Sequence, residues 1–288
     1  MKQVILNADD FGLTRGVNEG IIRCHREGIL TSATLMANAP AFDDAVERAK
    51  ANPKLGIGCH LVLTGGVSVT SPEKIPSLAS SDGRLPKSLG EFVARVSSGR
   101  IRAVDIETEL RAQIEKIRQA GIEPTHVDTH KHTHVHPRVM GVVVRVAHDL
   151  GISRIRNPVE RFSDSWRSAR RDRASRIGDL AASAAVLSVG WEFRAISGRY
   201  GLRFPEHFLG LAATGRLSAA ALCELIDALP EGRTEIMLHP GICDADLAAT
   251  GSRLQRQRQT EMEALLSAEA KRAVKEADVR LITFRELN

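Results

Sequence analysis

The sequence predicts an α/β fold built on a parallel sheet, either an α/β barrel or a wide doubly wound sheet. Two observations lead to this prediction: short apolar runs alternate with segments of helical periodicity, and several of the apolar runs end in polar residues. Strands that alternate with helices are typical of parallel sheets. Both architectures routinely use a length of 288 residues as one unit, so we expect a single domain over residues 1–288.

The first half of the chain repeats a strand–helix unit. The apolar run 4–6 ends at two aspartates, and apolar residues then recur at helical spacing from 17 to 24. The same alternation predicts strands over 31–36, 55–63 and 124–129, and helices over 42–51, 106–120 and 139–150. Residues 64–87 are rich in Gly, Ser and Pro and are too long for an ordinary connection. We therefore expect an active-site loop there that covers the mouth of a cleft.

The second half departs from this regularity. A strand over 153–156 is followed by an arginine-rich stretch and then by a stretch of small apolar residues, so we expect a helical insertion around 161–191. Its arginines are taken as a solvated helix face, with contact to an anionic membrane as the alternative. The regular pattern then returns as a helix over 218–228, a strand over 235–238, a helix near 260–268 and a strand over 280–283.

Composition narrows the class of protein. A hydrophobic content of 43% with 26% charged residues suits a globular core. The four cysteines are far apart without a CxxC pair, so we expect them to be reduced, and no run resembles a signal peptide or a membrane span. We therefore expect a cytoplasmic protein. The net charge is +5, but one Tyr and two Trp offer little stacking for bases, so no nucleic-acid partner is expected.

Asp9 and Asp10 stand together at the end of the first predicted strand. Two adjacent carboxylates repel each other unless a cation or a proton resolves the conflict. Neighbours on a strand point to opposite faces, so one carboxylate can bind a metal while the other acts as a base. The alternative is that Asp10 caps the next helix.

Histidines dominate two other strand ends. His60 lies within the strand 55–63, and the segment 125–137 places every acidic or imidazole side chain at an even position: His126, Asp128, His130, His132, His134 and His136. On a strand these side chains would share one face. Metal or substrate binding explains them better than a core, because each buried imidazole needs a partner. An exposed His-rich loop with incidental metal affinity is the alternative.

Two further strand ends carry candidate residues. His239 follows the strand 235–238 at a His-Pro-Gly turn and fits general acid chemistry, with a plain turn residue as the alternative. Arg156 ends the strand 153–156 and either orients a carboxylate or polar substrate group or is an ordinary surface arginine. One aspartate with two histidines leaves open positions on a metal and suits zinc, while also admitting magnesium, manganese or cobalt.

Four motifs in this order resemble the YdjC-like carbohydrate deacetylases: Asn7-Ala8-Asp9-Asp10-Phe11-Gly12, Gly58-x-His60-Leu61, Asp128-x-His130-x-His132 and His239-Pro240-Gly241. The resemblance spans nearly the whole chain. It implies a catalytic domain with a barrel-like parallel sheet, a deformed or incomplete TIM-type barrel related to polysaccharide deacetylases. It also implies one divalent metal ion, zinc with magnesium as the alternative, and removal of the acetyl group from an N-acetylglucosamine-type sugar.

The resemblance assigns roles to five of these residues. It implies that Asp10, His60 and His130 bind the metal, that Asp9 is the base that activates water, and that His239 is the acid that protonates the leaving amine.

Three more residues are expected to support these roles or to contact the substrate. His132 faces the same way as His130 on a predicted strand, so either histidine could reach the ion. Asp128 is expected to orient one of the two. Arg156 completes this supporting group.

A narrower resemblance concerns the substrate. Segments that resemble the hopanoid-biosynthesis-associated branch of the family are Gly28-Ile29-Leu30-Thr31, His60-Leu61-Val62-Leu63, Asp82-Gly83-Arg84 and His130-Lys131-His132. They imply an N-acetylglucosaminyl hopanoid lipid as substrate, with a chitooligosaccharide such as diacetylchitobiose as the alternative. A glycolipid substrate would bring the protein to the inner face of the membrane, and a homodimer is left open.

Two other functions compete with deacetylation. A metal-dependent phosphoesterase would also use Asp and His ligands, although no second carboxylate cluster is evident for a two-metal site. A non-catalytic module that binds sugars or lipids would keep the barrel and the metal, although a base and an acid are both retained here.

Overall fold

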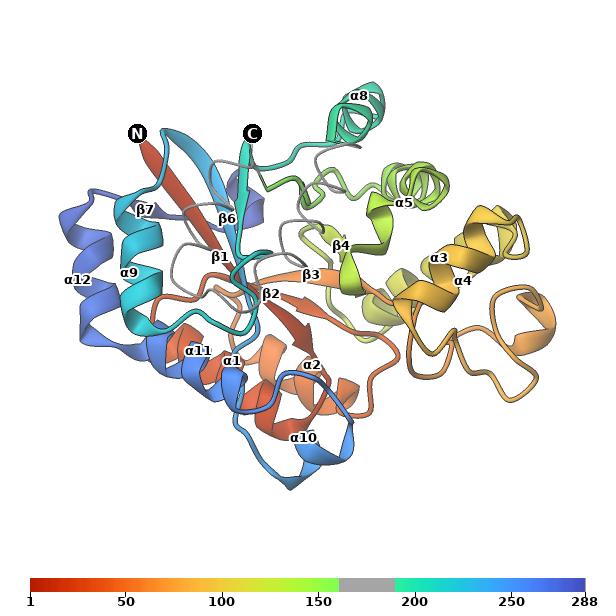
Figure 1. Cartoon of the computed structure of the whole chain (residues 1–288), viewed down its shortest axis with the longest axis horizontal. Helices are drawn as coiled ribbons and strands as arrows, with labels where there is room; N and C mark the ends of the chain where they lie inside the picture. The colour runs from red at the N-terminus through yellow and green to blue at the C-terminus, as the bar shows by residue number, and fades with distance from the viewer. Residues whose placement is uncertain (161–189, 288) are drawn as a thin grey trace.

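The strand β1 (Lys2–Phe11) lies at the centre of the molecule and is buried from Val4 onward. The other strands are β2 (Ser32–Leu35), β3 (Gly56–Leu61), β4 (Val127–Thr129), β5 (His207–Leu209), β6 (Gly232–Leu238) and β7 (Arg280–Leu281). This computed structural model describes residues 1–160 and 190–287. All its strand pairs are parallel, in the order β4-β3-β2-β1-β6-β5, with β7 beside β1 (Figure 1).

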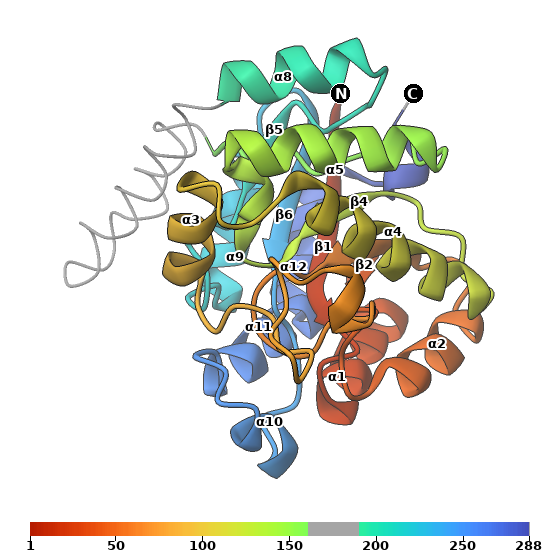
Figure 2. The ribbon, with the colours of Figure 1, turned by 90° about the vertical axis from the view of Figure 1, so that its right-hand side faces the viewer.

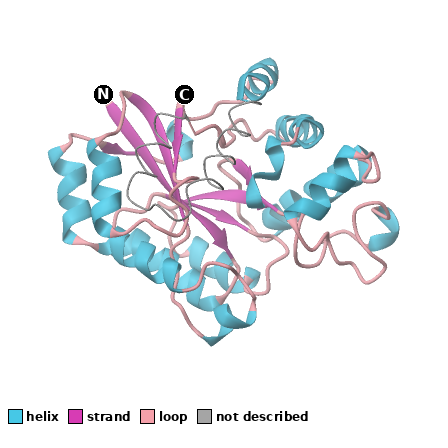
Figure 3. Ribbon diagram, viewed as in Figure 1, coloured by secondary structure: helices cyan, strands magenta, loops and turns pink. Residues whose placement is uncertain are grey.

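Helices surround this sheet (Figure 3). They are α1 (Arg15–Glu27), α2 (Phe42–Lys50), α3 (Leu89–Ser97), α4 (Ala103–Gln119), α5 (Pro137–Asp149), α8 (Gly190–Arg199), α9 (Ala219–Asp227), α10 (Ala245–Ala249), α11 (Arg256–Leu266) and α12 (Ala268–Glu276). In Figure 2, α5 and α8 run side by side along one edge of the molecule. None of the helices in the described ranges is long and apolar enough to cross a membrane.

The sheet approaches a closed barrel without completing it. Beyond β4, an isolated parallel bridge joins Val127 to Ile155, and a second joins Arg154 to Arg203. These bridges continue the pairing toward the segment that leads into β5, which itself pairs with β6. The predicted α/β fold with an incomplete, barrel-like parallel sheet is therefore confirmed.

Most of the predicted elements are present, and several are not. The segment 153–156 makes only isolated bridges, and the strand predicted through the His-rich segment ends at Thr129. The short strand β5 and the helices α3, α10 and α12 were not predicted. The predicted insertion around 161–191 falls on residues 161–189, outside the described residues, except at its end, where α8 begins.

Helix starts explain how the chain leaves the strand ends. Thr14 caps α1 by accepting from the backbone N–H of Val17 at 3.1 Å, so the alternative that Asp10 caps this helix is wrong. Pro137 occupies the first turn of α5, where its missing N–H costs no hydrogen bond. Asp9 and Asp10 are therefore not used to cap α1, and their carboxylates can interact with the imidazoles at the other strand ends.

The end of β1 is irregular at the two aspartates. The pairing of β1 with β2 shifts register between Ala8 and Phe11, and Asp10 has a φ of 65°. Asp tolerates this left-handed backbone better than most residues with a Cβ. The irregularity breaks the alternation of side chains, so Asp9 and Asp10 line the same cavity instead of opposite faces.

Candidate active site

A cavity of about 750 Å³ lies at the carboxyl ends of the strands. It is lined by residues from four separate strand ends, among them Asp9, Asp10, His60, His130 and His239. Residues 64–66 and Lys87, from the two ends of the predicted active-site loop, line it as well. Segments that are far apart in the sequence therefore converge here, as the parallel sheet predicts.

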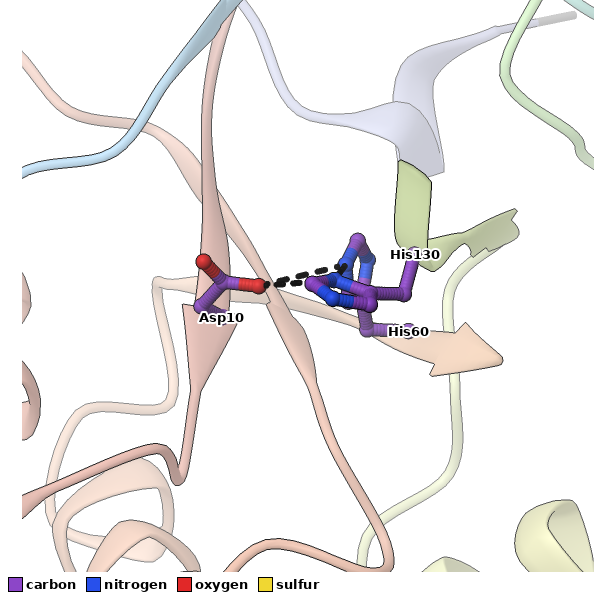
Figure 4. A group of neighbouring side chains, drawn as sticks. All are labelled: Asp10, His60 and His130. Atoms are coloured by element: carbon purple, nitrogen blue, oxygen red, sulfur yellow. Dashed lines mark hydrogen bonds and ion pairs between the residues drawn. The ribbon is translucent and has the colours of Figure 1, made fainter. Parts of the chain in front are cut away.

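Asp10, His60 and His130 form a compact triad inside this cavity (Figure 4). Oδ1 of Asp10 lies 3.4 Å from Nε2 of His60 and 3.2 Å from Nδ1 of His130, and the two nitrogens are 3.3 Å apart. Two ligand atoms that bind one tetrahedral ion at about 2.1 Å stand about 3.4 Å apart. The three donors therefore fit a single divalent ion and leave room for further ligands on it.

Asp128 fixes the orientation of His60. Its Oδ1 lies 2.7 Å from Nδ1 of His60, so the other ring nitrogen faces Asp10 and His130. Burial lowers the pKa of His60, but the carboxylates of Asp128, Asp10 and Asp9 outweigh it and raise the pKa to about 10. This point of the cavity thus favours positive charge. Asp128 was expected to orient His130 or His132, and that expectation is wrong, because its imidazole partner is His60.

The histidines of the segment 125–137 do not share one face. Lys131 and His132 have φ values of 54° and 53°, which turn the chain after β4, and only His130 joins the triad. His132 lines the cavity with its ring edge toward Phe208. The others have structural positions: His126 stacks on Phe284, His134 contacts Thr129, and His136 caps α5.

Arg156 is fully buried, so its reading as a surface arginine is wrong. Its two terminal nitrogens contact the two oxygens of Asp9 at 2.6 and 2.8 Å. Nη1 also lies 2.9 Å from Asp128, and Nε lies 2.7 Å from Glu235. Neither Arg156 nor Asp128 belongs to the described residues that line the cavity. They act on the site indirectly, because Arg156 contacts Asp9 and Asp128 contacts His60.

Arg156 also occupies what would otherwise be a second cation site. Asp9, His60 and Asp128 offer three ligand atoms close together, but the guanidinium of Arg156 contacts both carboxylates. Burial favours the neutral form of Asp9, yet Arg156 outweighs it and holds the pKa of Asp9 far below its usual range. Asp9 is therefore ionised at every ordinary pH.

His239 enters the cavity from the turn after β6. Its backbone N–H donates to Oε2 of Glu261 at 2.6 Å, and Oε1 of Glu261 accepts from the N–H of Gly215 at 2.8 Å. Nδ1 of His239 is buried and has no hydrogen-bond partner within the described part of the chain. Burial lowers the pKa of His239 to about 4 against the pull of Asp10 and Asp9, so the ring is neutral at pH 7.

Two residues that α11 brings to the site, Arg258 and Glu261, were not predicted from the sequence. Nη2 of Arg258 lies 2.5 Å from Oδ2 of Asp10, and Glu261 follows one helical turn later. Burial raises the pKa of Asp10, but Arg258 and the two histidines outweigh it and hold the pKa well below its usual value. Neither residue stands in a motif or at a strand end, and both contact partners distant in the sequence, so the pattern contained no signal for them.

Comparisons with known proteins agree with this geometry. The family model described as YdjC-like protein matches residues 3–276. A carbohydrate deacetylase from Brevibacillus brevis is 33% identical over 286 residues, which are 99% of each chain. A chitooligosaccharide deacetylase from Proteus mirabilis is 32% identical and covers 99% of this chain and 98% of its own. A solved structure from Enterococcus faecalis, named for cellobiose-phosphate cleavage, has a TM-score of 0.79 at 27% identity and covers 99% of this chain and 98% of its own.

Proposed function

This chain belongs to the YdjC-like protein family, and from that premise we propose that it is a metal-dependent hydrolase that removes the acetyl group from an N-acetylglucosamine-type sugar. One observation carries the proposal: Asp10, His60 and His130 bring their ligand atoms within 3.2–3.4 Å of one another at a cavity of about 750 Å³. The names of the relatives from Brevibacillus brevis and Proteus mirabilis support deacetylation of a carbohydrate.

The donor set favours zinc, with magnesium as the alternative. Two imidazole nitrogens and one carboxylate oxygen suit zinc, whereas magnesium prefers a full set of oxygen ligands. A bound ion would supply Lewis acidity toward the attacking water and the amide carbonyl. The triad provides three ligands, as catalytic zinc sites do, and so leaves a position for water or substrate.

Asp9 and His239 are proposed to move the protons. Asp9 accepts a proton as the oxygen of water bonds to the acetyl carbon, and Arg156 keeps its carboxylate ionised and in place. The C–N bond then breaks and releases acetate and a free amine, which leaves only when protonated. His239 is neutral at pH 7, so it has to gain a proton during turnover before it delivers one to the nitrogen.

The competing functions find less support. A two-metal phosphoesterase needs a second cation site, and the guanidinium of Arg156 already contacts Asp9 and Asp128 there. A purely binding module would not need a neutral histidine and an ionised carboxylate beside the metal ligands. Both are present in this cavity.

We further propose that the acetylated sugar is carried by an apolar group, as in an N-acetylglucosaminyl hopanoid lipid. Leu89 lines the cavity while remaining 39% exposed, and Val93 lies one helical turn further along α3 at 37%. Val67, in the adjacent loop, is 49% exposed. Val67 follows Gly66, which lines the cavity as Leu89 does, and exposed apolar side chains at a cavity support binding of an apolar group. Diacetylchitobiose is the second candidate, supported by the name of the Proteus mirabilis relative.

Acetate release tests this proposal. The zinc-loaded protein is incubated with an N-acetylglucosaminyl lipid and, separately, with diacetylchitobiose, beside the variants Asp9→Asn and His239→Ala. We expect zinc-dependent acetate release that falls by about 10²-fold or more in each variant, because general acid–base groups contribute about 10²–10⁴-fold. The preferred substrate identifies the branch of the family.

Two outcomes would contradict the proposal. If neither substrate releases acetate with zinc or magnesium, the deacetylase assignment fails for these sugars. If the protein instead hydrolyses phosphate esters and leaves acetamides intact, the phosphoesterase alternative replaces it.

A further inference from the structure

Arg258 is buried at the wall of the cavity, although arginine is normally a surface residue. Its side chain is 2% exposed and lines the cavity together with Asp10, His60 and His130. Arg256, on the same helix, is exposed to solvent instead. Buried charged groups are normally paired and hydrogen-bonded.

Two of the three nitrogens of Arg258 have acceptors. Nη2 donates to Oδ2 of Asp10 at 2.5 Å, and Nε donates to the backbone carbonyl of Leu254 at 3.3 Å. These contacts fix the plane of the guanidinium. Nη1 is buried and has no hydrogen-bond partner in the part of the chain that the structure describes. A buried polar group without a partner destabilises the folded protein, and a charged one does so more strongly.

We propose that Arg258 is a catalytic residue whose Nη1 donates a hydrogen bond to the oxygen of the bound acyl group, first the acetamide carbonyl and later the acetate product. The inference rests on the proposed function, because Asp10 joins the two: its Oδ1 belongs to the triad and its Oδ2 holds Arg258. Nη1 and Nη2 are parts of one rigid guanidinium, so the free donor lies beside the triad.

Amide hydrolysis creates negative charge that Nη1 of Arg258 could stabilise. When water adds to the acetyl carbon, the carbonyl oxygen gains negative charge, and the guanidinium is permanently positive. A donor already in place stabilises that charge without rearranging. Removing one such donor typically costs about 10²–10³-fold in kcat.

A simpler role for Arg258 is to position Asp10 only. That role predicts weaker metal binding in a variant, and recovery of activity at saturating metal. The catalytic role predicts a loss of kcat that saturating metal does not repair. Measuring zinc affinity, kcat and acetate affinity together distinguishes the positioning role from the catalytic role.

The test compares Arg258→Lys with Arg256→Lys, a matched substitution at the exposed arginine of α11. A lysine keeps the positive charge and can still pair with Asp10, but it has no planar second nitrogen to donate to the acyl oxygen. Zinc affinity is measured by competition with a chelating indicator, acetate affinity by calorimetry on the zinc-loaded protein, and kcat by acetate release.

We expect Arg258→Lys to bind zinc within about threefold of the wild type, to bind acetate roughly tenfold or more weakly, and to lose about 10²-fold in kcat. Arg256→Lys should match the wild type in all three measurements. The inference is overturned if excess zinc restores the activity of Arg258→Lys, or if its acetate affinity is unchanged.

The acetate arm also separates this inference from the proposed function. If the wild type releases no acetate from any acetylated sugar but binds acetate more tightly than Arg258→Lys, the proposed reaction fails and the acyl-oxygen site stands. If the zinc-loaded wild type does not bind acetate, the inference itself is wrong.

Discussion

Asp10 couples the backbone of β1 to the chemistry of the site. Its left-handed backbone brings its side chain into the same cavity as that of Asp9, and its two oxygens have different partners. Oδ1 faces His60 and His130, while Oδ2 holds Arg258. Asp9 is held by Arg156 instead. Two adjacent carboxylates thus avoid mutual repulsion because each has its own cationic partner.

Replacing Asp128 should weaken metal binding. Its carboxylate fixes which nitrogen of His60 faces the triad, and partners of this kind typically contribute about 10–100-fold to metal affinity. We expect Asp128→Asn to raise the Kd for zinc by about that factor in a chelator competition. A Kd equal to that of the wild type would show that Asp128 does not support the triad.

Glu235 should carry a proton at neutral pH. Burial raises its pKa to about 8 in spite of Arg156, and the nearby Asp128 and Asp9 add to the shift. Since the ordinary glutamate pKa is 4.5, the folded protein holds a proton that the unfolded chain has lost between these two values. This contribution to stability is complete below the unfolded pKa and is lost as the pH rises through about 8.

The variant Glu235→Gln tests that proton, because glutamine resembles a neutral glutamic acid. Its free energy of unfolding relative to the wild type should rise as the pH increases from about 5 to about 9. Chemical denaturation at both pH values measures it. Glu115→Gln, at an exposed position of α4, is the control and should show no such trend. A pH-independent difference for Glu235→Gln would mean that the glutamate is ionised in the folded protein.

Among single residues, the sequence pattern singled out polar side chains at or near the ends of apolar runs, which include Asp10, His60 and His130. The family resemblance then selected these three as metal ligands. Glu235 and Arg258 were missed, because one lies within a strand, the other within a helix, and each meets partners far away in the sequence. Local pattern does not contain that information.

Among the elements, α11 supports the site through two buried side chains, Arg258 and Glu261. Arg258 and Glu261 lie one turn apart, so one face of the helix holds both Asp10 and the backbone of His239. The turn after β4 places His130 beside Asp10 and His60. It was predicted as strand because Lys131 and His132 are not the glycines that usually signal a left-handed backbone.

Glu261→Gln should displace His239, the proposed general acid, and leave the metal ligands in place. Glu261 accepts hydrogen bonds from the backbone N–H groups of His239 and Gly215. In the glutamine variant, one of these N–H groups would face the side-chain amide nitrogen, which is a donor, and would lose its hydrogen bond. We expect a loss of about 1–3 kcal/mol in stability and a lower kcat, with zinc affinity unchanged. The exposed Glu263→Gln is the matched control on α11. If Glu261→Gln weakened zinc binding as well as lowering kcat, the substitution would be acting on the metal-binding triad and not on His239.

At the scale of the whole molecule, the site depends on contacts that span the chain. Asp9 and Arg156 are 147 residues apart, and Asp10 and Arg258 are 248 apart. The alternation of strands and helices predicted the parallel sheet that makes these contacts possible, and the family resemblance implied its barrel-like curl. The strand predicted over 153–156 forms only single-residue bridges, so the pattern located this continuation of the sheet beyond β4 but overstated its regularity.

A metal that joins three elements should stabilise the whole fold. Zinc at about 100 times its Kd adds about 2.7 kcal/mol to the free energy of unfolding when only the folded state binds it. The melting temperature should therefore rise with zinc in the wild type, and much less in His130→Ala, which lacks one ligand of the triad. An equal rise in both proteins would mean that zinc binds elsewhere.

Acetate release with and without metal is the measurement that decides whether the protein is a metal-dependent deacetylase. The protein is stripped with a chelator, reloaded with one equivalent of zinc, and assayed on the acetylated glycolipid and on diacetylchitobiose, beside Asp10→Asn treated in the same way. We expect release that disappears on stripping, returns with zinc in the wild type, and stays absent in Asp10→Asn. Release that survives stripping, or that Asp10→Asn retains, would contradict a metal-dependent deacetylase centred on Asp10, His60 and His130.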